Sequence, residues 1–423
     1  MSQNYSKLIK QAFPESVSRL IIQAGDLARS MSCGIYLVGG VVRDLLLDRK
    51  NEDIDIMLEG DAIRFAELLA QALNTGITSY KKFGTATLKA GSYEIDFTTC
   101  RSETYSRPGA LPSVKPGDIT ADLFRRDFTI NSMALSIAPG KFGELIDLYN
   151  GRQDIENKLI RVLHSESFTD DATRIMRAIR YEQRLDFEIE TKTAKLLTRD
   201  LDMLDRISGD RLRKEISLWF GEPEPERIIH RADELAVLRK LHPRLHWNNN
   251  VSEAFFHAGK HAKPVSPVQL YYCLLVYGLN ELELDELLRR LNISRGKLGD
   301  LCRQTINLKN RLGLLGEKEI KRADIYYLLR DFSPPAIRAN ALYHTSRRIR
   351  VYLDLYLDKL RFTKTLLNGR DLVRMGIPEG RLIGTVLQDL LAAKLNGEVQ
   401  TRLDEERLAR SIISRLSDPG MDQ

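Results

Sequence analysis

Cysteine is scarce in this sequence, and the few residues present are far apart. Cys33, Cys100, Cys273 and Cys302 form no CxxC pair among the 423 residues. This spacing argues against a zinc site, whose thiolate ligands usually come in close pairs. It is typical of reduced thiols, so we expect a cytoplasmic protein.

Long hydrophobic runs and the common nucleotide-binding patterns are also missing. No apolar stretch approaches the roughly 20 residues that cross a bilayer, and residues 1–13 lack the apolar core of a secretory signal, so we expect no membrane association. The absence of GxxxxGK(S/T) excludes a Walker-type NTPase, and the absence of GxGxxG leaves a Rossmann domain unsupported. With 43% hydrophobic and 29% charged residues, the chain is an ordinary globular sequence.

The most informative feature is a glycine pair followed by two alternating aspartates. A short apolar segment runs into Gly39-Gly40, and the next apolar segment opens with Asp53-x-Asp55. Alternate strand residues lie on one face about 7 Å apart, and two carboxylates held there need a cation. Mg²⁺ favours such oxygen ligands, and the N–H groups of a Gly-Gly turn that opens a helix suit a phosphate. The pattern predicts metal-assisted chemistry on a nucleoside triphosphate.

A third carboxylate is expected if two metal ions are held about 3.5–4 Å apart. Asp96 is the candidate, because it falls on a later predicted strand whose residues Ile95 and Phe97 face the other way. The third ligand could also serve as the base that deprotonates an attacking hydroxyl. An isolated Asp-x-Asp more often marks an exposed strand end, but the preceding glycine pair weakens that alternative here.

A pair of arginines follows at 125–126. Guanidinium groups bind oxyanions bidentately, so Arg125 and Arg126 suit a triphosphate, and Asp127 can accept a hydrogen bond from a ribose hydroxyl. The alternative is a helix start that carries ordinary surface charges.

A helix is predicted over residues 170–181, with Asp171 and Arg174 as i,i+3 neighbours on one face. Arg177 and Arg180 continue this spacing as a basic stripe. A rigid Asp–Arg pair presents acceptors and donors to the edge of a base, so protein side chains could select a nucleotide. The alternative is a solvated, ion-paired helix face.

Strands and helices alternate in the first part of the chain, and helices dominate the rest. An amphipathic helix is predicted at 15–33, and 101–118, with three prolines and two glycines, is predicted to be a long exposed loop. From about residue 168 we predict no strand. The expected fold class is α+β, a mixed-sheet head with helices at 1–150, then all-helical domains at 151–220, 221–335 and 336–423. The predicted strands are 35–38, 53–58, 77–81, 85–89, 93–98 and 134–138.

These motifs together resemble those of the class II tRNA nucleotidyltransferases, the family of CCA-adding enzymes and bacterial poly(A) polymerases. The resemblance is detailed over 35–220 and weaker near the C-terminus. It implies a nucleotidyltransferase-superfamily head followed by a neck, a body and a tRNA-binding tail. None of the seven histidines precedes an aspartate, so the HD-type domain of some relatives is not expected.

The resemblance also implies roles for individual residues. The segment 125–131 resembles the ribose-selecting motif, and Asp171-x-x-Arg174 resembles the motif that pairs with incoming CTP or ATP like a protein template. The family usually has Glu where this chain has Asp170. The implied Mg²⁺ ligands are Asp53 and Asp55, with Asp96 as the third carboxylate. The implied nucleotide contacts are Gly39, Gly40, Arg43, Arg126, Asp127, Asn131, Asp171 and Arg174. From the basic stripe we add Arg177 and Arg180 as candidate nucleotide contacts.

A basic segment in the last part of the chain is the expected RNA contact. Between Tyr343 and Arg370 there are seven Lys or Arg and two acidic residues, in a chain of net charge +6 and pI about 9.0. Phosphate contacts carry no sequence information, which suits recognition of tRNA by shape. For any single residue a solvated helix face is the alternative. The candidates are Arg347, Arg348, Arg350, Lys359, Arg361 and Lys364.

The implied activity is template-independent addition of CCA, or of its terminal A, to the 3′ end of tRNA from CTP and ATP, with pyrophosphate released. Three enzymatic alternatives remain: an enzyme that adds only A, one that adds only CC, and a poly(A) polymerase. A catalytically silent RNA-binding protein is the non-enzymatic alternative, which Asp53, Asp55 and Asp96 argue against. No obligate protein partner is expected.

Overall fold

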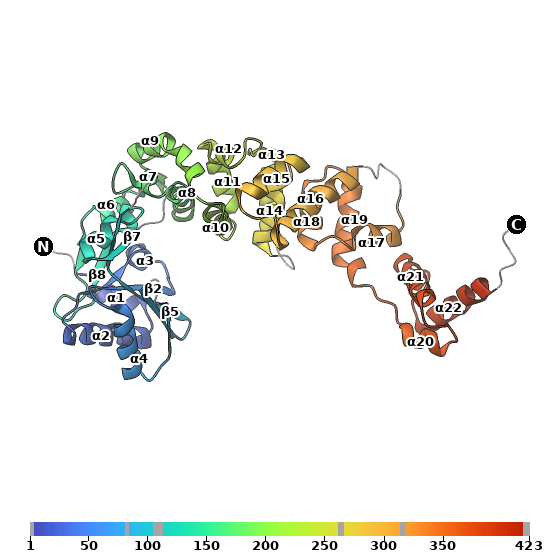
Figure 1. The fold of residues 1–423 in the computed structure, drawn as a ribbon, viewed down its shortest axis with the longest axis horizontal. Helices are drawn as coiled ribbons and strands as arrows, with labels where there is room; N and C mark the ends of the chain where they lie inside the picture. The colour runs from blue at the N-terminus through green and yellow to red at the C-terminus, as the bar shows by residue number, and fades with distance from the viewer. Residues whose placement is uncertain (1–3, 81–83, 105–112, 261–265, 314–318, 418–423) are drawn as a thin grey trace. The chain divides into compact units, whose positions relative to one another are not determined.

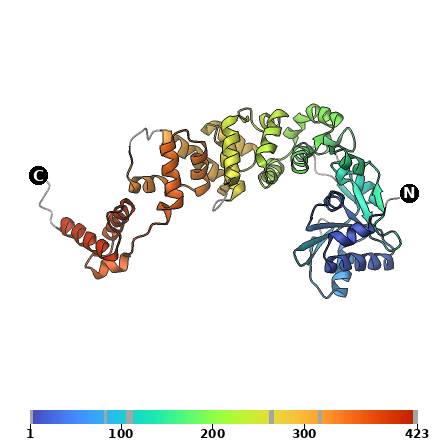
Figure 2. The same ribbon diagram turned by 180° about the vertical axis from the view of Figure 1, so that it is seen from behind.

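The computed structural model describes residues 4–80, 84–104, 113–260, 266–313 and 319–417 (Figures 1 and 2). Contacts divide the chain into two compact units, which are described separately. The first comprises Met1–Trp219 with Glu234–Lys240, and the second comprises Phe220–Asp233 with Leu241–Gln423. Across the described ranges, no helix is both long enough and apolar enough to span a membrane.

The chain up to residue 219 alternates strands with short helices. Its strands are β1 Ile35–Val38, β2 Asp53–Leu58, β3 Ile77–Tyr80, β4 Thr85–Ala90, β5 Tyr93–Thr99, β6 Arg101–Thr104, β7 Ser113–Pro116, β8 Met133–Ser136, β9 Leu145–Asp147, β10 Leu159–Ile160 and β11 Glu188–Ile189. Its helices are α1 Ser6–Ala12, α2 Glu15–Ser30, α3 Gly40–Leu46, α4 Ala62–Ala72, α5 Ile119–Phe124, η2 Thr129–Asn131, α6 Gly151–Glu156, α7 Ser167–Asp170, α8 Thr173–Leu185, α9 Thr191–Arg199, η3 Leu201–Arg206 and α10 Gly209–Trp219.

The remaining described chain consists of helices and connecting segments. They are α11 Pro225–Glu234, α12 Val237–Leu241, α13 Asn249–Lys260, α14 Pro267–Val276, α15 Glu281–Arg290, α16 Lys297–Gly313, α17 Arg322–Leu329, α18 Pro334–Tyr343, α19 Arg347–Asp358, η4 Leu360–Phe362, α20 Gly369–Arg374, α21 Arg381–Asn396 and α22 Arg402–Ser417.

One mixed sheet organises the first unit, with strand order β3-β4-β5-β2-β1-β8-β9. Strand β2 lies near its centre, antiparallel to β1 and parallel to β5. Ile54 and Ile56 of β2 are buried in the core, where Phe65 of α4 contacts Phe97 of β5 at a ring distance of 5.6 Å. The alternation of a strand therefore leaves the other face of β2 to Asp53 and Asp55.

Every predicted strand forms, but the structure adds strands that the sequence did not suggest. Within the predicted loop at 101–118, β6 and β7 pair antiparallel, and residues 105–112 lie outside the described chain. The prediction of no strand after residue 168 is also wrong, because β11 pairs with β10. A two-residue strand offers too few residues to show alternation, so periodicity missed it.

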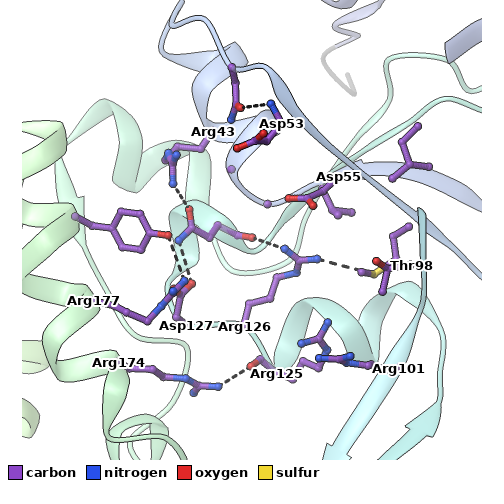
Figure 3. Close-up of a pocket in the computed structure, with 18 of the residues that line it drawn as sticks. Arg43, Asp53, Asp55, Thr98, Arg101, Arg125, Arg126, Asp127, Arg174 and Arg177 are labelled. Carbon is purple, nitrogen blue, oxygen red and sulfur yellow. Dashed lines mark hydrogen bonds and ion pairs between the residues drawn. The ribbon is translucent and has the colours of Figure 1, made fainter. Parts of the chain in front are cut away.

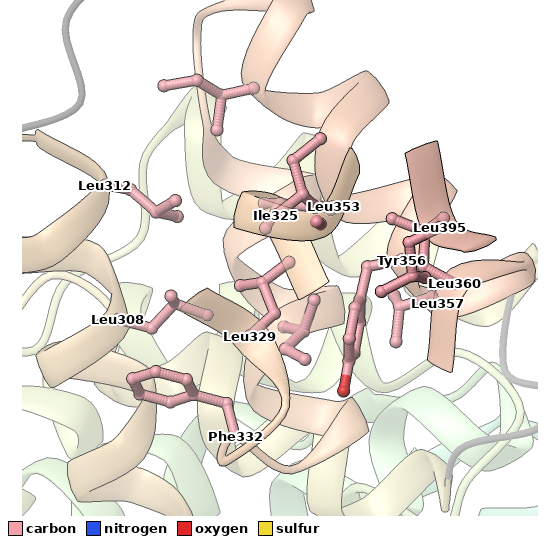
Figure 4. Packing of buried hydrophobic residues seen from close by; sticks show 14 residues of the cluster. Leu308, Leu312, Ile325, Leu329, Phe332, Leu353, Tyr356, Leu357, Leu360 and Leu395 are labelled. Atoms are coloured by element: carbon pink, nitrogen blue, oxygen red, sulfur yellow. The ribbon is translucent and has the colours of Figure 1, made fainter. Parts of the chain in front are cut away.

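A continuous hydrophobic cluster in the second unit crosses the predicted boundary at 335/336 (Figure 4). It joins Leu308 and Phe332 on one side of that point to Leu353 and Leu395 on the other. The Pro334-Pro335 pair at this boundary occupies the first turn of α18, where proline is tolerated. A separate cluster is built from Leu367, Leu372, Ile377, Val386, Leu390, Ala409 and Ile412. The rest of the four-domain division stays a prediction.

Gly25 of helix α2 is expected to be needed for packing against the sheet. A Cβ at this position would overlap the backbone carbonyl of Ile137, just beyond β8. Gly25→Ala should therefore lower the free energy of unfolding by about 1–3 kcal/mol, measured by urea denaturation. Gly76→Ala, where a Cβ meets nothing within 4 Å, is the matched control. Equal stability of the two variants would contradict this close packing.

Candidate active site

A cavity of about 740 Å³ lies in the first unit (Figure 3). Its walls come from the β1–α3 turn, strand β2, the segment after α5 and helix α8. All the predicted catalytic and nucleotide-binding residues line it except Asp96 and Arg180. The sequence did not single out Tyr181, which follows Arg177 by one helical turn, or Thr98, which shares a strand face with Asp96. Arg101, Arg184, Asn51 and Thr85 were also missed.

Strand β2 places Asp53 and Asp55 at the cavity, and the parallel register pairs Asp55 with Asp96 of β5. The Asp96 carboxylate accepts a hydrogen bond from the Thr87 hydroxyl at 2.5 Å. The protein around Asp55 displaces water and raises the pKa of this carboxyl to about 6; the charge of Arg126 opposes the rise, and Asp96 and Asp53 add to it. The carboxylates of Asp53 and Asp96 therefore lie close enough for their charges to act on Asp55.

The donor set of Asp53 and Asp55 suits a divalent metal ion. Two carboxylates on one face would supply hard oxygen ligands, which such an ion prefers. Among the residues that the structure describes, no group of three or more His, Cys, Asp or Glu side chains is arranged to hold a metal by itself. The role of Asp96 as third ligand therefore stays a prediction.

Gly39 is needed where the chain turns from β1 into α3. Its φ of +72° is a conformation that side-chain-bearing residues rarely adopt. A Cβ at Gly39 would also lie 2.6 Å from Nη1 of Arg126. Gly40 has neither constraint, since a Cβ there would lie 3.6 Å from Arg43. Only the first glycine of the pair is therefore required by the backbone and by the approach of Arg126.

Arg43 is buried at the cavity wall and held on two sides. Its Nε and Nη2 donate to the neighbouring Asp44 at 2.9 Å, and its Nη1 donates to Oδ1 of Asn131 at 2.7 Å. The guanidinium also lies 5.3 Å from the centre of the Tyr181 ring. This arrangement fixes a positive charge beside the Gly39 turn, as a triphosphate contact requires.

Asp127 is an anchor for other side chains, with 8% of its surface exposed. Its Oδ1 accepts from Phe128 N and Asn131 Nδ2, and its Oδ2 accepts from Arg177 Nε and Nη2, all at 2.6–3.0 Å. Burial raises the pKa of Asp127, but Arg177 and Asn131 outweigh that effect and hold it at about 2. These four bonds use the usual acceptor capacity of a carboxylate. A ribose hydroxyl would have to displace one of them, so the predicted ribose contact stays a prediction.

The predicted helix over 170–181 is interrupted at Asp171. Helix α7 ends at Asp170, Asp171 is extended, and α8 begins at Thr173. Asp171 accepts from Nη2 of Arg211 at 2.6 Å, whereas Arg174 donates to the Ser167 hydroxyl at 2.7 Å and to the Arg125 carbonyl at 2.6 Å. The expected i,i+3 geometry is therefore wrong, although tertiary contacts bring both side chains to the cavity.

The basic stripe also differs from expectation, because its residues do not share one face. Arg174 and Arg180 are buried, with 5% and 7% of their surfaces exposed. The alternative of a solvated helix face is therefore wrong for these two residues. Of the three arginines in the predicted stripe, Arg174 and Arg177 line the cavity and Arg180 does not. Each step of three residues rotates a side chain by about 60° around the helix, which carries Arg180 away from the cavity. Its guanidinium lies 5.3 Å from the centre of the Tyr181 ring, and its assignment to the nucleotide stays a prediction.

The predicted RNA-binding residues lie on and after helix α19 of the second unit. Arg361 is half-buried, with its guanidinium 4.8 Å from the centre of the Phe362 ring. Arg347 and Arg350 line a cavity together with Arg338. The exposed members of the set are Arg347, Arg348, Arg350, Lys359 and Lys364.

Comparisons with known proteins match this architecture. The family model of the poly A polymerase head domain matches residues 35–161, and that of the probable RNA and SrmB-binding site of polymerase A matches 186–247. An A-adding tRNA nucleotidyltransferase of Geobacter sulfurreducens is 36% identical over 420 residues, or 95% of this chain and 48% of that protein.

Solved structures resemble the chain over nearly its full length. An apo form of a CCA-adding enzyme is 31% identical with a TM-score of 0.83, covering 98% of this chain and 99% of the other. The Thermotoga maritima CCA-adding enzyme complexed with tRNA is 31% identical with a TM-score of 0.77. This match also covers 98% of this chain and 99% of the other. The chain therefore belongs to the class II tRNA nucleotidyltransferases, the family that contains the CCA-adding enzymes. It spans about half the length of the first two A-adding relatives that it matches.

Asp127→Asn should destabilise the protein most at neutral pH. The pKa of Asp127 falls from 3.8 to about 2 on folding, so its charge contributes stability above pH 4 that is lost as the pH falls through 2. The difference in unfolding free energy between wild type and variant should narrow by about 1 kcal/mol from pH 6 to pH 3. Urea denaturation of wild type and variant at each pH measures this difference in unfolding free energy.

The control for this prediction is Asp26→Asn, which removes a carboxylate that is 54% exposed on α2. Its effect on stability should be small at both pH values, because exposed ion pairs contribute little. A difference for Asp127→Asn that does not change with pH would contradict the ion pair with Arg177.

Proposed function

We propose that this chain transfers a nucleotidyl group from a ribonucleoside triphosphate to the 3′ end of tRNA. The observation that carries the proposal is one cavity that combines the carboxylates of Asp53 and Asp55 with the cations of Arg43 and Arg126. The minimal activity is addition of the terminal A from ATP, a step that CCA-adding and A-adding enzymes share. Addition of the two preceding C residues from CTP is the fuller form of the same proposal.

The reaction exchanges one phosphorus–oxygen bond for another. The 3′-hydroxyl oxygen of the RNA attacks the α-phosphorus of ATP, the bond between the α-phosphorus and the bridging oxygen breaks, and pyrophosphate leaves with the electron pair. The hydroxyl proton passes to a base, for which Asp96 is the candidate because of its register opposite Asp55. Arg43 and Arg126 would neutralise triphosphate charge from fixed positions.

Asp53 and Asp55 would hold Mg²⁺ in this proposal. The ion supplies positive charge that lowers the pKa of the hydroxyl and stabilises the oxygen atoms that carry charge in the transition state. Magnesium in particular is proposed because the donors are carboxylate and phosphate oxygens, which it prefers.

Base choice would come from the wall opposite the carboxylates. Asp171 supplies acceptors and Arg174 supplies donors, and both are held by surrounding protein groups rather than by each other. Fixed partners keep these groups oriented without a nucleic-acid template. The exposed basic residues Arg347, Arg348, Arg350, Lys359 and Lys364, with the half-buried Arg361, would contact tRNA phosphates. A cytoplasmic location is consistent with four free cysteines.

Removing the metal-binding carboxylates should abolish transfer. The double variant Asp53→Asn with Asp55→Asn is expected to reduce AMP incorporation into tRNA by at least about a thousandfold, because charge stabilisation at the phosphates is lost. Labelled ATP measures incorporation, and filter binding should show tRNA affinity near that of wild type.

Glu94→Gln is the matched control for this double variant. Glu94 is the register partner of Asp53 on β5, but its exposed side chain pairs with Lys89. Its activity should stay near wild type. Wild-type activity in the double variant would refute the metal site.

The substrate assay distinguishes this proposal from its alternatives. The protein is given tRNA that ends before CCA, after C, or after CC, with labelled CTP or ATP. One AMP added to tRNA ending in CC is the expected minimum, and CMP added to the shorter tRNAs identifies a CCA-adding enzyme. Addition of CMP without addition of AMP would identify a CC-adding enzyme. Long A tails on unrelated RNA would identify a poly(A) polymerase. No incorporation would refute the proposed function.

A further inference from the structure

Asp122 of helix α5 lies behind the cavity wall and binds two arginines that line the cavity. Its side chain is completely buried. Oδ1 accepts from Nε and Nη2 of Arg125 at 2.9 and 2.7 Å, and Oδ2 accepts from Nε and Nη2 of Arg126 at 3.2 and 2.9 Å. One carboxylate thus holds two guanidinium groups by the same paired contact, which fixes orientation as well as distance.

The two arginines serve opposite sides of the cavity. Arg126 extends toward the carboxylates of β2 and occupies the space that Gly39 leaves open. A Cβ at Gly39 would lie 2.6 Å from Nη1 of Arg126 and 3.9 Å from Oδ2 of Asp55. The Arg125 carbonyl accepts from Arg174 on the base-selecting side at 2.6 Å. Figure 3 shows the side chains of Arg126 and Arg125 diverging from neighbouring positions of one segment.

Arg125 also connects this centre to the hairpin of β6 and β7. Its Nη1 lies 3.1 Å from Glu103 of β6, and the same Glu103 carboxylate pairs with Arg101 at 3.0 Å. The amide of Arg101 lies 3.4 Å from Oδ1 of Asp122. Asp122 therefore binds the arginine on the triphosphate side and the arginine that pairs with the hairpin, and it anchors the residue whose backbone carbonyl holds Arg174.

Without the contact to Asp122, the Arg126 side chain could adopt a different position that does not favour the reaction. Long cationic side chains lose about 2 kcal/mol of rotamer entropy when they are fixed, and an unsupported Arg126 would be drawn to the carboxylates of Asp53 and Asp55. Such a pairing would occupy the groups proposed to hold the metal and would remove the cation from the triphosphate. A buried carboxylate behind Arg126 prevents this because it binds Nε and Nη2 and leaves Nη1 toward Gly39.

We propose that Asp122 is a positioning residue that sets triphosphate binding and base selection together, by orienting Arg126 and Arg125 from behind the cavity. This inference rests on the proposed nucleotidyl transfer. Asp122 itself does not line the cavity in the described chain, so it acts through the two arginines and not by contact with substrate.

Asp122→Asn tests the proposal with little change in volume. The amide nitrogen of the new side chain faces arginine N–H donors, so one guanidinium loses its acceptor. The dissociation constant for ATP with Mg²⁺, measured by calorimetry, should rise about 10- to 100-fold. The preference for ATP over GTP in incorporation should fall, and KM for tRNA should stay near wild type. Asp122→Glu, which keeps the charge, should recover part of the ATP affinity.

Asp154→Asn is the matched control for a purely structural effect. Asp154 is 4% exposed, lies in the same unit, pairs with Arg161 at 3.0 Å and accepts the Thr129 hydroxyl at 2.6 Å, outside the cavity lining. It should lower the unfolding temperature without changing ATP affinity or base preference. If Asp122→Asn is too unstable to purify, Asp122→Glu against Asp154→Glu provides the same comparison.

The outcomes separate this inference from the proposed function. Wild-type ATP affinity and base preference in Asp122→Asn would overturn the inference, as would equal losses in Asp154→Asn. Wild-type protein that binds ATP but extends no tRNA would overturn the proposed function, while the binding comparison would still decide the role of Asp122. Wild-type protein that fails to bind ATP would overturn both.

Discussion

The site depends on ion pairs that hold arginines whose side chains are at most 30% exposed. Asp44 holds Arg43, Asp122 holds Arg126, and Asp127 holds Arg177, each through hydrogen bonds at 3.2 Å or less. A charge removed from water is costly unless a partner with good geometry compensates it. The pairing therefore explains how several cations coexist at one wall, and it leaves them oriented before the triphosphate of the proposed reaction would bind. Stabilisation from such fixed charges needs little reorganisation during the reaction.

The sheet supplies the opposite charge by the same alternation that builds its core. Ile54 and Ile56 lie in the core, so Asp53 and Asp55 must lie on the other face of β2. A slip of one residue would expose the isoleucines and bury the carboxylates, so the hydrophobic core fixes the position of the site. Parallel pairing with β5 then adds Asp96 beside Asp55 and strengthens the need for a cation.

Predictions from sequence succeeded where one local rule dominates and failed where partners come from distant segments. Strand alternation and the Gly39 turn were predicted because each follows from a few adjacent residues. Helical spacing gave the wrong geometry for Asp171, which lies between two helices and pairs with Arg211, 40 residues away. The same spacing predicted a nucleotide contact for Arg180, which lies outside the cavity lining, so that contact stays a prediction. The boundary predicted at 335/336 falls inside a hydrophobic cluster that joins residues from both sides of it.

The sequence by itself determined the fold class, the family resemblance and the two carboxylates of β2, because these depend on residue type, spacing and alternation along a short segment. Only the tertiary structure decided which acceptor holds which arginine, since that depends on segments far apart in the chain meeting at one wall. Asp122 is the clearest case. In the sequence it is one more acidic residue before an arginine pair, and in the fold its burial makes it the common partner of both.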